Sequence, residues 1–457
     1  MSRLQTKTAD QESSIWKFLP EDTFRQHLVE LEKCTNAVPI EPQTFALDSQ
    51  KLGSAESYTL PLETEQQIAD DFAFLAAIEE GAQSVAAVCL EEYLEPPRLV
   101  VRFAALDLSL SDEVKDALNS ITKLLSTVTE SEESTRTEEL FSKIVDLHFR
   151  RLLARLRSLK WEKPKYLAKQ HKKPLWQDFD NLNHRIQFVY TKKEASLRRE
   201  VEALVQQLAA TYEAFETMEP GSQDEISSLQ NLIKASYTFC KTEKIADFAR
   251  RLEQSVTATP TPKVASAIKC LRQIEKLGAY WRVCTSLVSF SLNFPTLFQG
   301  EAPLALKFLT PYQAVETKIG YETWATSCHV HAEVQLAVYY DLLSQSCPPN
   351  TGPAFLPPRV IGTSKWLCYL CYQFLRAHGR FLPANTHGRL YDQWTIPDLA
   401  EYKEELRARY QRIVSDIDAE VVRETGISEQ EEVGSILRWR AEPMTSRQNL
   451  LGVDGAC

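Results

Sequence analysis

The chain has 457 residues, enough to bury a sizeable hydrophobic core in two or three domains. Hydrophobic residues make up 44% of the sequence, charged residues 25%, and the formal charge is −10 at pH 7. This balance is typical of globular proteins and argues against a protein that coats nucleic acid over its whole surface. The N-terminus is polar and no apolar run has the length of a membrane span, so we expect an intracellular protein, cytoplasmic or nuclear, with no membrane partner.

The first 262 residues carry mainly helical patterns. Ser111 is followed by acidic residues and then by an apolar stripe at helical spacing, and a similar stripe begins near Glu139. Thr191 and Glu194 have the spacing of a capping box, which marks the start of a further helix. We therefore predict a large N-terminal helical domain over residues 1–262.

Three segments interrupt or end this helical region. Residues near 36–63 and 129–138 are rich in Pro, Ser, Thr and acidic side chains, which is typical of loops. Residues 257–262 contain two prolines two positions apart, and such a pair cannot continue a helix. The linker predicted there places the domain boundary at residue 262.

Beyond the linker, helical and strand-like patterns alternate. The predicted helices cover about 263–290, 331–343, a segment that begins near 368, and 398–422, and short strands are predicted at 359–362 and 381–382. Alternation of this kind favours a layered α/β fold. We expect an α/β domain over residues 263–425, closed by its last helix, and a polar C-terminal tail over 426–457.

One pattern in this second domain carries chemistry. His331-Ala332-Glu333 is followed, after a further 34 residues, by Cys368-x-x-Cys371. Histidine and two cysteines are zinc ligands, and a set of three leaves the fourth position open, as in catalytic zinc sites. Glu333 is close enough in sequence to the histidine to act as a proton carrier beside the metal. We expect each pair to lie in the first turn of a helix, whose positive end favours thiolate and hydroxide.

The order H-x-E then C-x-x-C resembles the zinc-dependent cytidine deaminase-like superfamily. The flanking motifs are more specific. Ile361-Gly362-Thr363-Ser364-Lys365 before the cysteines, and Thr386-His387-Gly388-Arg389-x-Tyr391-x-x-Trp394 after them, resemble the OTT-type deaminase-like family, which is common among fungi. The resemblance covers about residues 328–397. It departs from the superfamily at Leu367, where a proline usually precedes the first cysteine.

The resemblance implies a cytidine deaminase-like three-layer α/β domain that binds Zn²⁺. His331, Cys368 and Cys371 would hold the metal, and Glu333 would be the catalytic proton shuttle. The implied reaction is hydrolytic deamination, in which zinc hydroxide attacks an amidine-like ring carbon and ammonia leaves. The substrate would be a small nucleobase or nucleotide, or a base in single-stranded nucleic acid, and these alternatives stay open.

Four residues of the flanking motifs are candidates for substrate binding: Ser364, Lys365, His387 and Trp394. Each also has a structural interpretation. The lysine can lie in solvent at a strand end, the histidine can satisfy a turn, and the tryptophan can pack in the core.

Two other functions compete with the deaminase. In the first, Cys328 completes a closed structural zinc site with His331, Cys368 and Cys371, and the protein is a non-catalytic helical scaffold. In the second, the protein binds nucleic acid through the segment 150–173, which has ten Lys or Arg residues, one acid and interleaved aromatic residues. The alternative for that segment is an exposed basic face paired with nearby acidic helices.

Overall fold

The computed structural model describes residues 13–48, 50, 58–79, 85–106, 110–165, 173–254, 261–299, 304–347, 354–430 and 450–451. The chain divides into two compact units. Unit 1 combines Met1–Ala77, Ala82–Thr127 and Phe290–Thr445, and unit 2 combines Ile78–Gly81, Val128–Ser289 and Ser446–Cys457. Segments from both the N-terminal and the C-terminal parts of the sequence therefore form unit 1. The domain boundary predicted at residue 262 coincides with none of the boundaries between the two units. The reason is a sheet whose strands come from both parts of the sequence.

That sheet has the strand order β4-β3-β2-β7. β2 (Ala86–Leu94) and β3 (Pro97–Ala105) form an antiparallel hairpin, and β4 (Ala305–Phe308) pairs with β3 in parallel. β7 (Gly362–Thr363) pairs with the start of β2. The hairpin departs from the helical pattern predicted for the first 262 residues. Seven consecutive residues of β2 are buried, so its sequence lacks the polar and apolar alternation that reveals a half-exposed strand.

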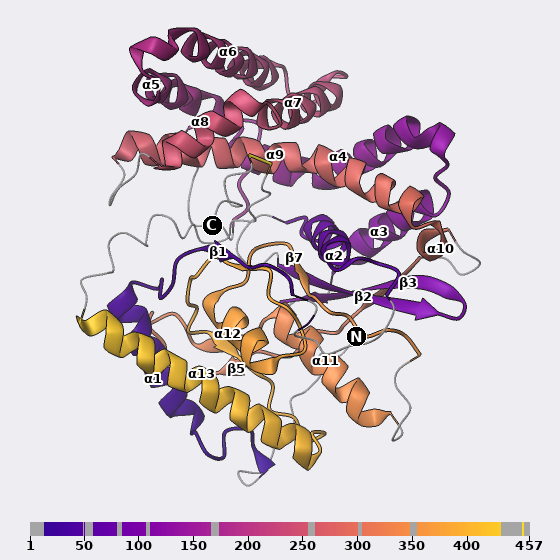
Figure 1. Ribbon diagram of the computed structural model, residues 1–457, viewed down its shortest axis with the longest axis vertical. Coiled ribbons are helices and arrows are strands. Elements are labelled where there is room, and N and C mark those ends of the chain that lie inside the picture. The colour runs from indigo at the N-terminus through magenta and orange to yellow at the C-terminus, as the bar shows by residue number, and fades with distance from the viewer. Residues whose placement is uncertain are drawn as a thin grey trace. The chain divides into compact units, whose positions relative to one another are not determined.

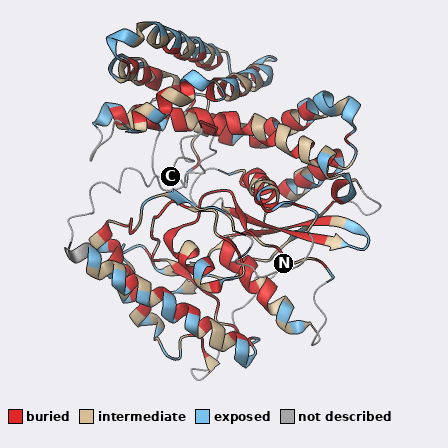
Figure 2. Ribbon diagram, in the orientation of Figure 1, coloured by how far each residue is buried: buried red, intermediate tan, exposed pale blue. Residues whose placement is uncertain are grey.

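Helices cover this sheet on both sides (Figure 1). α2 (Leu62–Ala76) packs against β2 and β7, and α11 (Ala332–Ser346) packs against β2 and β3. The contact with α2 is very close at Gly362, where an added Cβ would lie 2.2 Å from the carbonyl carbon of Ala69. Figure 2 shows the central strands of the sheet as buried. The predicted combination of a helical region with an α/β region is therefore present.

The segments around the candidate site form shorter strands and one further helix. β6 (Ser327–Val330) lies between β5 (Val315–Glu316) and β9 (Trp394–Thr395), antiparallel to the first and parallel to the second. β1 (Gln43–Thr44) pairs with β8 (Asn385–Thr386). α12 (Tyr369–His378) begins directly after Cys368, as predicted for the second ligand pair.

Long helices close unit 1. α13 (Glu404–Gln430) packs against α1 (Glu21–Thr35) and α12, so it extends past residue 425, where the polar tail was predicted to begin. α3 (Asp112–Leu125) and the short α10 (Pro295–Phe298) also belong to this unit. Most of the predicted linker and tail lies outside the described residues.

Unit 2 is helical, as the sequence predicts for this region. Its described helices are α4 (Glu133–Leu156), α5 (Phe179–Val189), α6 (Ala195–Thr217), α7 (Glu225–Cys240), α8 (Glu243–Gln254) and most of α9 (Pro262–Asn293). The capping box predicted at Thr191 and Glu194 is confirmed. Among the described helices of both units, none is long and apolar enough to cross a membrane.

The prediction of a loop over residues 129–138 is wrong. Residues Glu130–Glu132 form a short 3-10 helix (η3), and α4 begins at Glu133. Thr129 donates a hydrogen bond to the Glu132 carboxylate, and Arg136 forms ion pairs with Glu132 and Glu139. Polar residues spaced three or four apart stabilise an exposed helical turn, so polarity alone did not indicate a loop here.

Candidate metal centre

Three potential metal ligands converge where two helices begin. His331 is the N-cap residue of α11, delivered there by β6, and Cys368 is the N-cap residue of α12. Nδ1 of His331 lies 3.6 Å from Sγ of Cys368 and 3.4 Å from Sγ of Cys371. The three donor atoms all lie within 4.8 Å of one another. Both helices direct their positive N-terminal ends toward this group, which favours thiolates and other anions.

Glu333 lies next to the same three ligands. It occupies the first turn of α11, and only 4% of it is exposed. Its Oε2 lies 3.5 Å from Sγ of Cys371. Burial raises the pKa of this carboxyl above its usual value, and the nearby positive charge of His331 opposes the increase. A buried carboxyl therefore lies beside the three potential metal ligands.

The two cysteines differ in their proton affinity. Burial acts to raise the pKa of Cys368, but hydrogen bonds from Cys371 and the contact with His331 outweigh it, so that pKa is lowered. Burial raises the pKa of Cys371, and the neighbouring Cys368 and Glu333 raise it further. The backbone N–H of Cys371 donates to the Cys368 sulfur at 3.3 Å, as expected for a thiolate at a helix N-cap.

The surroundings of Cys371 fit a metal-bound thiolate. Trp394 in β9 is fully buried, and its indole Nε1 has no hydrogen-bond partner in the described structure. This indole lies close enough to Cys371 to lower the pKa of that thiol, although it satisfies no full hydrogen-bond geometry. A buried N–H beside sulfur gains an acceptor when the sulfur is a thiolate. One imidazole and two sulfurs form a donor set whose chemistry is compatible with zinc.

A family model matches one segment of the chain. Residues 330–398 match the model of a family described as OTT_1508-like deaminase. This segment is similar to the OTT-type deaminases. The match confirms the resemblance that the motifs predicted, over nearly the same residues. No curated protein and no solved structure matches the chain.

Within the deaminase-like segment and the strand before it, the other possible ligands lie apart from the metal centre. Cys328 is buried in β6 and is absent from the group of described residues whose donor atoms converge. Burial raises its pKa to about 11, which disfavours a thiolate. His329 is also absent from that group, and its Nε2 lies 3.1 Å from the hydroxyl of Ser327. The closed site of three cysteines and one histidine is therefore not assembled among the described residues.

The candidate substrate residues occupy varied surroundings. Ser364 is buried, and its hydroxyl accepts a hydrogen bond from the Ala86 N–H at 3.0 Å, which extends the pairing of β7 with β2. Lys365 is also buried. Burial lowers the pKa of His387 to about 4, so the ring is neutral near pH 7. Its Nδ1 accepts a hydrogen bond from the Arg389 N–H at 3.1 Å, as expected for a turn.

The segment from Thr386 to Arg389 is held against the start of α12. The His387 N–H donates to the carbonyl of Leu367, and the Tyr369 N–H donates to the carbonyl of Arg389. Gly388 has a φ of +73°, and an added Cβ would lie 1.9 Å from the carbonyl oxygen of Ile40. Only glycine fits at this position, and the tight turn brings its neighbours beside the metal ligands.

Two residues of this region were not predicted as site residues. The ring of Tyr391 lies 6.3 Å from the ring of His331 and 6.0 Å from that of His387. Glu32 of α1 is buried, and burial, followed by the charge of Asp392, raises its pKa to about 7. The tyrosine lies inside the family-like motif, whereas nothing in the sequence connects Glu32 with Asp392, which lies 360 positions later.

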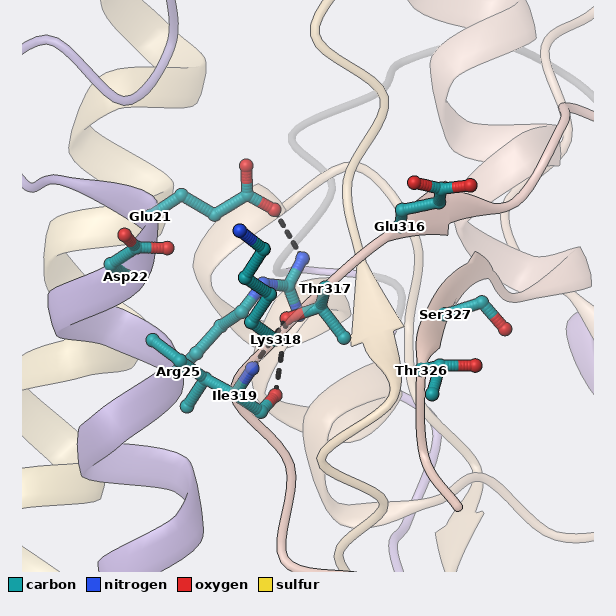
Figure 3. A pocket seen from close by; sticks show the side chains of 9 residues that line it. All are labelled: Glu21, Asp22, Arg25, Glu316, Thr317, Lys318, Ile319, Thr326 and Ser327. Atoms are coloured by element: carbon teal, nitrogen blue, oxygen red, sulfur yellow. Dashed lines mark hydrogen bonds and ion pairs between the residues drawn. The ribbon is translucent and has the colours of Figure 1, made fainter. Parts of the chain in front are cut away.

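A polar pocket lies elsewhere in unit 1, between the start of α1 and the strands β5 and β6 (Figure 3). It has a volume of about 740 Å³ and is lined by Glu21, Asp22, Arg25, Glu316, Thr317, Lys318, Ile319, Thr326 and Ser327. Glu21 and Arg25 form an ion pair across one wall. None of the three metal ligands lines this pocket, so it is separate from the metal centre.

The basic segment 150–173 is described in part. Lys160 forms an ion pair with Glu225 at 3.0 Å, and Arg157 and Lys173 both pair with Asp178. These acids belong to unit 2, like the cations. The described part of the segment therefore shows internal charge pairing, and residues 166–172 lie outside the description.

Proposed function

We propose that unit 1 is a zinc-dependent hydrolytic deaminase that acts on a nucleobase, a nucleotide or a base in nucleic acid. The convergence of His331, Cys368 and Cys371 beside Glu333, inside the segment that resembles deaminases, carries the proposal. The sheet order β3-β2-β7 between α2 and α11 supports a cytidine deaminase-like three-layer fold. The discontinuous unit means that the hairpin before residue 106 belongs to the proposed catalytic domain.

Each residue of the centre has a separate task. His331, Cys368 and Cys371 would hold the zinc ion from three sides. When bound, zinc supplies Lewis acidity that makes water nucleophilic near neutral pH. Glu333 would accept the proton of the attacking water and donate it to the amino group that leaves as ammonia. Burial of Glu333 excludes bulk water from this proton transfer and keeps the carboxyl directed at the site.

Substitution of Glu333 by glutamine tests the proposal. Glu333→Gln keeps the size of the side chain and removes its ability to carry a proton. We expect zinc content to remain at one ion per chain while ammonia release falls by about 10²–10⁴-fold. The measurement screens nucleosides, nucleotides and single-stranded oligonucleotides for ammonia release, with metal content determined on the same samples. Glu404→Gln, the same change in an exposed first turn of α13, is the matched control.

The result that would reject this function is unchanged ammonia release by zinc-loaded Glu333→Gln protein. The structural-zinc alternative requires Cys328 as the fourth ligand, so it predicts that zinc binding depends on Cys328. The position of Cys328 outside the convergent group disfavours it among the described residues. The internal ion pairs of the basic segment likewise give no support to the nucleic-acid alternative.

A further inference from the structure

Arg389 is fixed beside the metal centre by its own main chain. Its N–H donates to Nδ1 of His387 at 3.1 Å, and its carbonyl accepts from the N–H of Tyr369 at 2.9 Å. Tyr369 directly follows the ligand Cys368 and begins α12. The backbone of Arg389 therefore has little freedom to move away from the metal ligands.

Among the described residues, the half-buried side chain of Arg389 has no carboxylate partner. The residue is half-buried, and its Nε is buried without a hydrogen-bond partner. In the part of the chain that the structure describes, no carboxylate forms an ion pair with Arg389, whereas Arg359 and Arg409 of the same unit pair with Glu65 and Asp341. A buried guanidinium N–H without a partner is unfavourable, so an anion bound at this Nε would stabilise the side chain.

Nearby acids do not fill this role. The positive charge of Arg389 acts to lower the pKa of Glu32, but burial and Asp392 prevail and that pKa rises to about 7. Oε2 of Glu32 has no hydrogen-bond partner in the described structure. Glu32 is therefore only partly ionised near neutral pH, and it forms no ion pair with Arg389 among the described residues.

Aromatic packing does not account for Arg389 either. Its Cζ lies 5.7 Å from the ring centroid of Tyr391, near the outer limit of about 6 Å for a cation–π contact. Arg98 on the β2–β3 hairpin shows the closer arrangement, with its Cζ 4.2 Å from the ring of Tyr93. The Tyr391 ring instead connects Arg389 with the site, because it lies 6.3 Å from the His331 ring.

We infer that Arg389 binds a phosphate group of the substrate. A guanidinium matches phosphate with two parallel hydrogen bonds, and phosphate is the anion that base-bearing compounds carry. The substrate class is then a phosphorylated one, either a nucleotide or a phosphodiester of a single strand, rather than a free base or nucleoside. This inference rests on the proposed deaminase function and narrows its substrate.

The test compares matched substrates in the zinc-loaded full chain. Nucleosides of cytosine, adenine and guanine are each compared with their 5′-monophosphates and with a short single strand. We expect kcat/KM for ammonia release from a phosphorylated member to exceed that of its nucleoside by about 10–100-fold. Arg389→Gln should remove most of this advantage through KM, so that kcat/KM falls more for the monophosphate than for the nucleoside. Arg389→Lys should restore part of it, because lysine keeps the charge and loses the paired hydrogen bonds.

Arg98→Gln is the matched control, since it removes an arginine with a buried, unpartnered Nε beside a tyrosine at another place in unit 1. Its substrate preference should equal that of the unchanged protein. An equal loss for nucleoside and monophosphate in Arg389→Gln would indicate a structural role and overturn the inference. Equal kcat/KM values of the unsubstituted protein for the nucleoside and its monophosphate would also overturn the inference. A preference for the single strand over the monophosphate would assign the phosphate to a nucleic-acid backbone, and the reverse would assign it to a nucleotide.

Binding separates this inference from the proposed function. Calorimetry of the same monophosphates and nucleosides with zinc-loaded protein needs no turnover. Tighter binding of a monophosphate that is lost in Arg389→Gln, without ammonia release from any substrate, would leave phosphate recognition standing and reject the deaminase. Equal binding of nucleoside and monophosphate would reject phosphate recognition, whether or not ammonia is released.

Discussion

Helices α11 and α12 contribute to two buried polar clusters that differ in how their charges are satisfied. At the N-terminal ends the cluster consists of His331, Glu333, Cys368 and Cys371. Farther along the same helices, Asp341 and His378 form a second cluster with Arg409 and Tyr410 of α13. The first brings donor atoms together around a point that a cation would occupy. The second is closed, because protein groups supply every partner of its central carboxylate.

The pKa shifts of the two carboxyls express this difference. Burial alone would raise the pKa of Asp341, but hydrogen bonds from His378 at 2.8 Å and Tyr410 at 2.9 Å, with the charge of Arg409, lower it. The pKa of Glu333 is raised, since burial prevails there. A satisfied carboxylate stabilises the fold, whereas an unsatisfied one is available for chemistry.

The largest expected effect follows from removing a ligand of the open cluster. Cys371→Ser replaces a thiolate donor by a hydroxyl, so zinc bound at one ion per chain should be lost almost completely. Cys328→Ser is the matched control, a buried cysteine on β6 outside the ligand group, and should retain zinc. Metal analysis after gel filtration measures both. Loss of zinc in Cys328→Ser would indicate that Cys328 is a zinc ligand, and it would support the structural-zinc alternative.

A comparable change in the closed cluster should affect stability and spare the metal. Asp341→Asn removes the charge that holds His378 and Arg409, so we expect the free energy of unfolding to fall by about 3 kcal/mol. Zinc content should stay at one ion per chain. Denaturant unfolding and metal analysis on the same preparation give both values. Unchanged stability would show that the network contributes little, and lost zinc would show that the clusters are coupled.

The closed cluster also predicts a pH dependence. Burial, opposed by Asp341 and aided by the charges of Arg409 and Arg380, lowers the pKa of His378, so the folded state holds this ring neutral. The unfolded state then binds more protons below pH ~6.5, and stability should fall as the pH decreases from there through the folded pKa. One titrating ring can contribute a slope of at most about 1.4 kcal/mol per pH unit.

His378→Gln should flatten that part of the stability profile. The lowered pKa of Asp341 adds a second loss at more acidic pH, below the unfolded value of about 3.9, which the glutamine variant keeps only in part. Unfolding free energies between about pH 2 and pH 8 measure the two slopes. An identical slope in His378→Gln would assign the acid sensitivity to other groups.

The convergence of His331, Cys368 and Cys371 was predictable because its signals are local in sequence. Both ligand pairs start helices, so His331 and Cys368 could be placed at two positive helix ends before any tertiary contact was known. The β2–β3 hairpin was not predictable in the same way. Its strand β2 is buried on both faces, and its partner β7 lies more than 250 residues later in the chain. Periodicity within a short window contains neither fact.

The role inferred for Arg389 illustrates a second limit. The sequence places this residue within the recognised motif, but a missing ion pair is a property of the folded surroundings. The loop prediction for residues 129–138 failed for the opposite reason, because charged residues of this segment form ion pairs with one another along the surface of a helix. Sequence patterns therefore indicated which residues could form a site, and the folded structure shows which of their charges have partners.

Substitution of Trp394 has the smallest expected effect. It tests whether a neighbouring N–H group contributes to metal binding by the open cluster. Trp394→Phe keeps a buried ring against Phe374 and removes the indole N–H beside Cys371. Loss of such an outer contact typically weakens metal binding by 10–100-fold, and we expect about tenfold here because the geometry is loose. Competition with a chelator measures the affinity, and the charge-transfer band of the cobalt-substituted protein should shift. Trp281→Phe in α9, also in an edge-to-face contact with phenylalanine, is the control. A purely packing role for Trp394 would lower stability and leave both the affinity and the band unchanged.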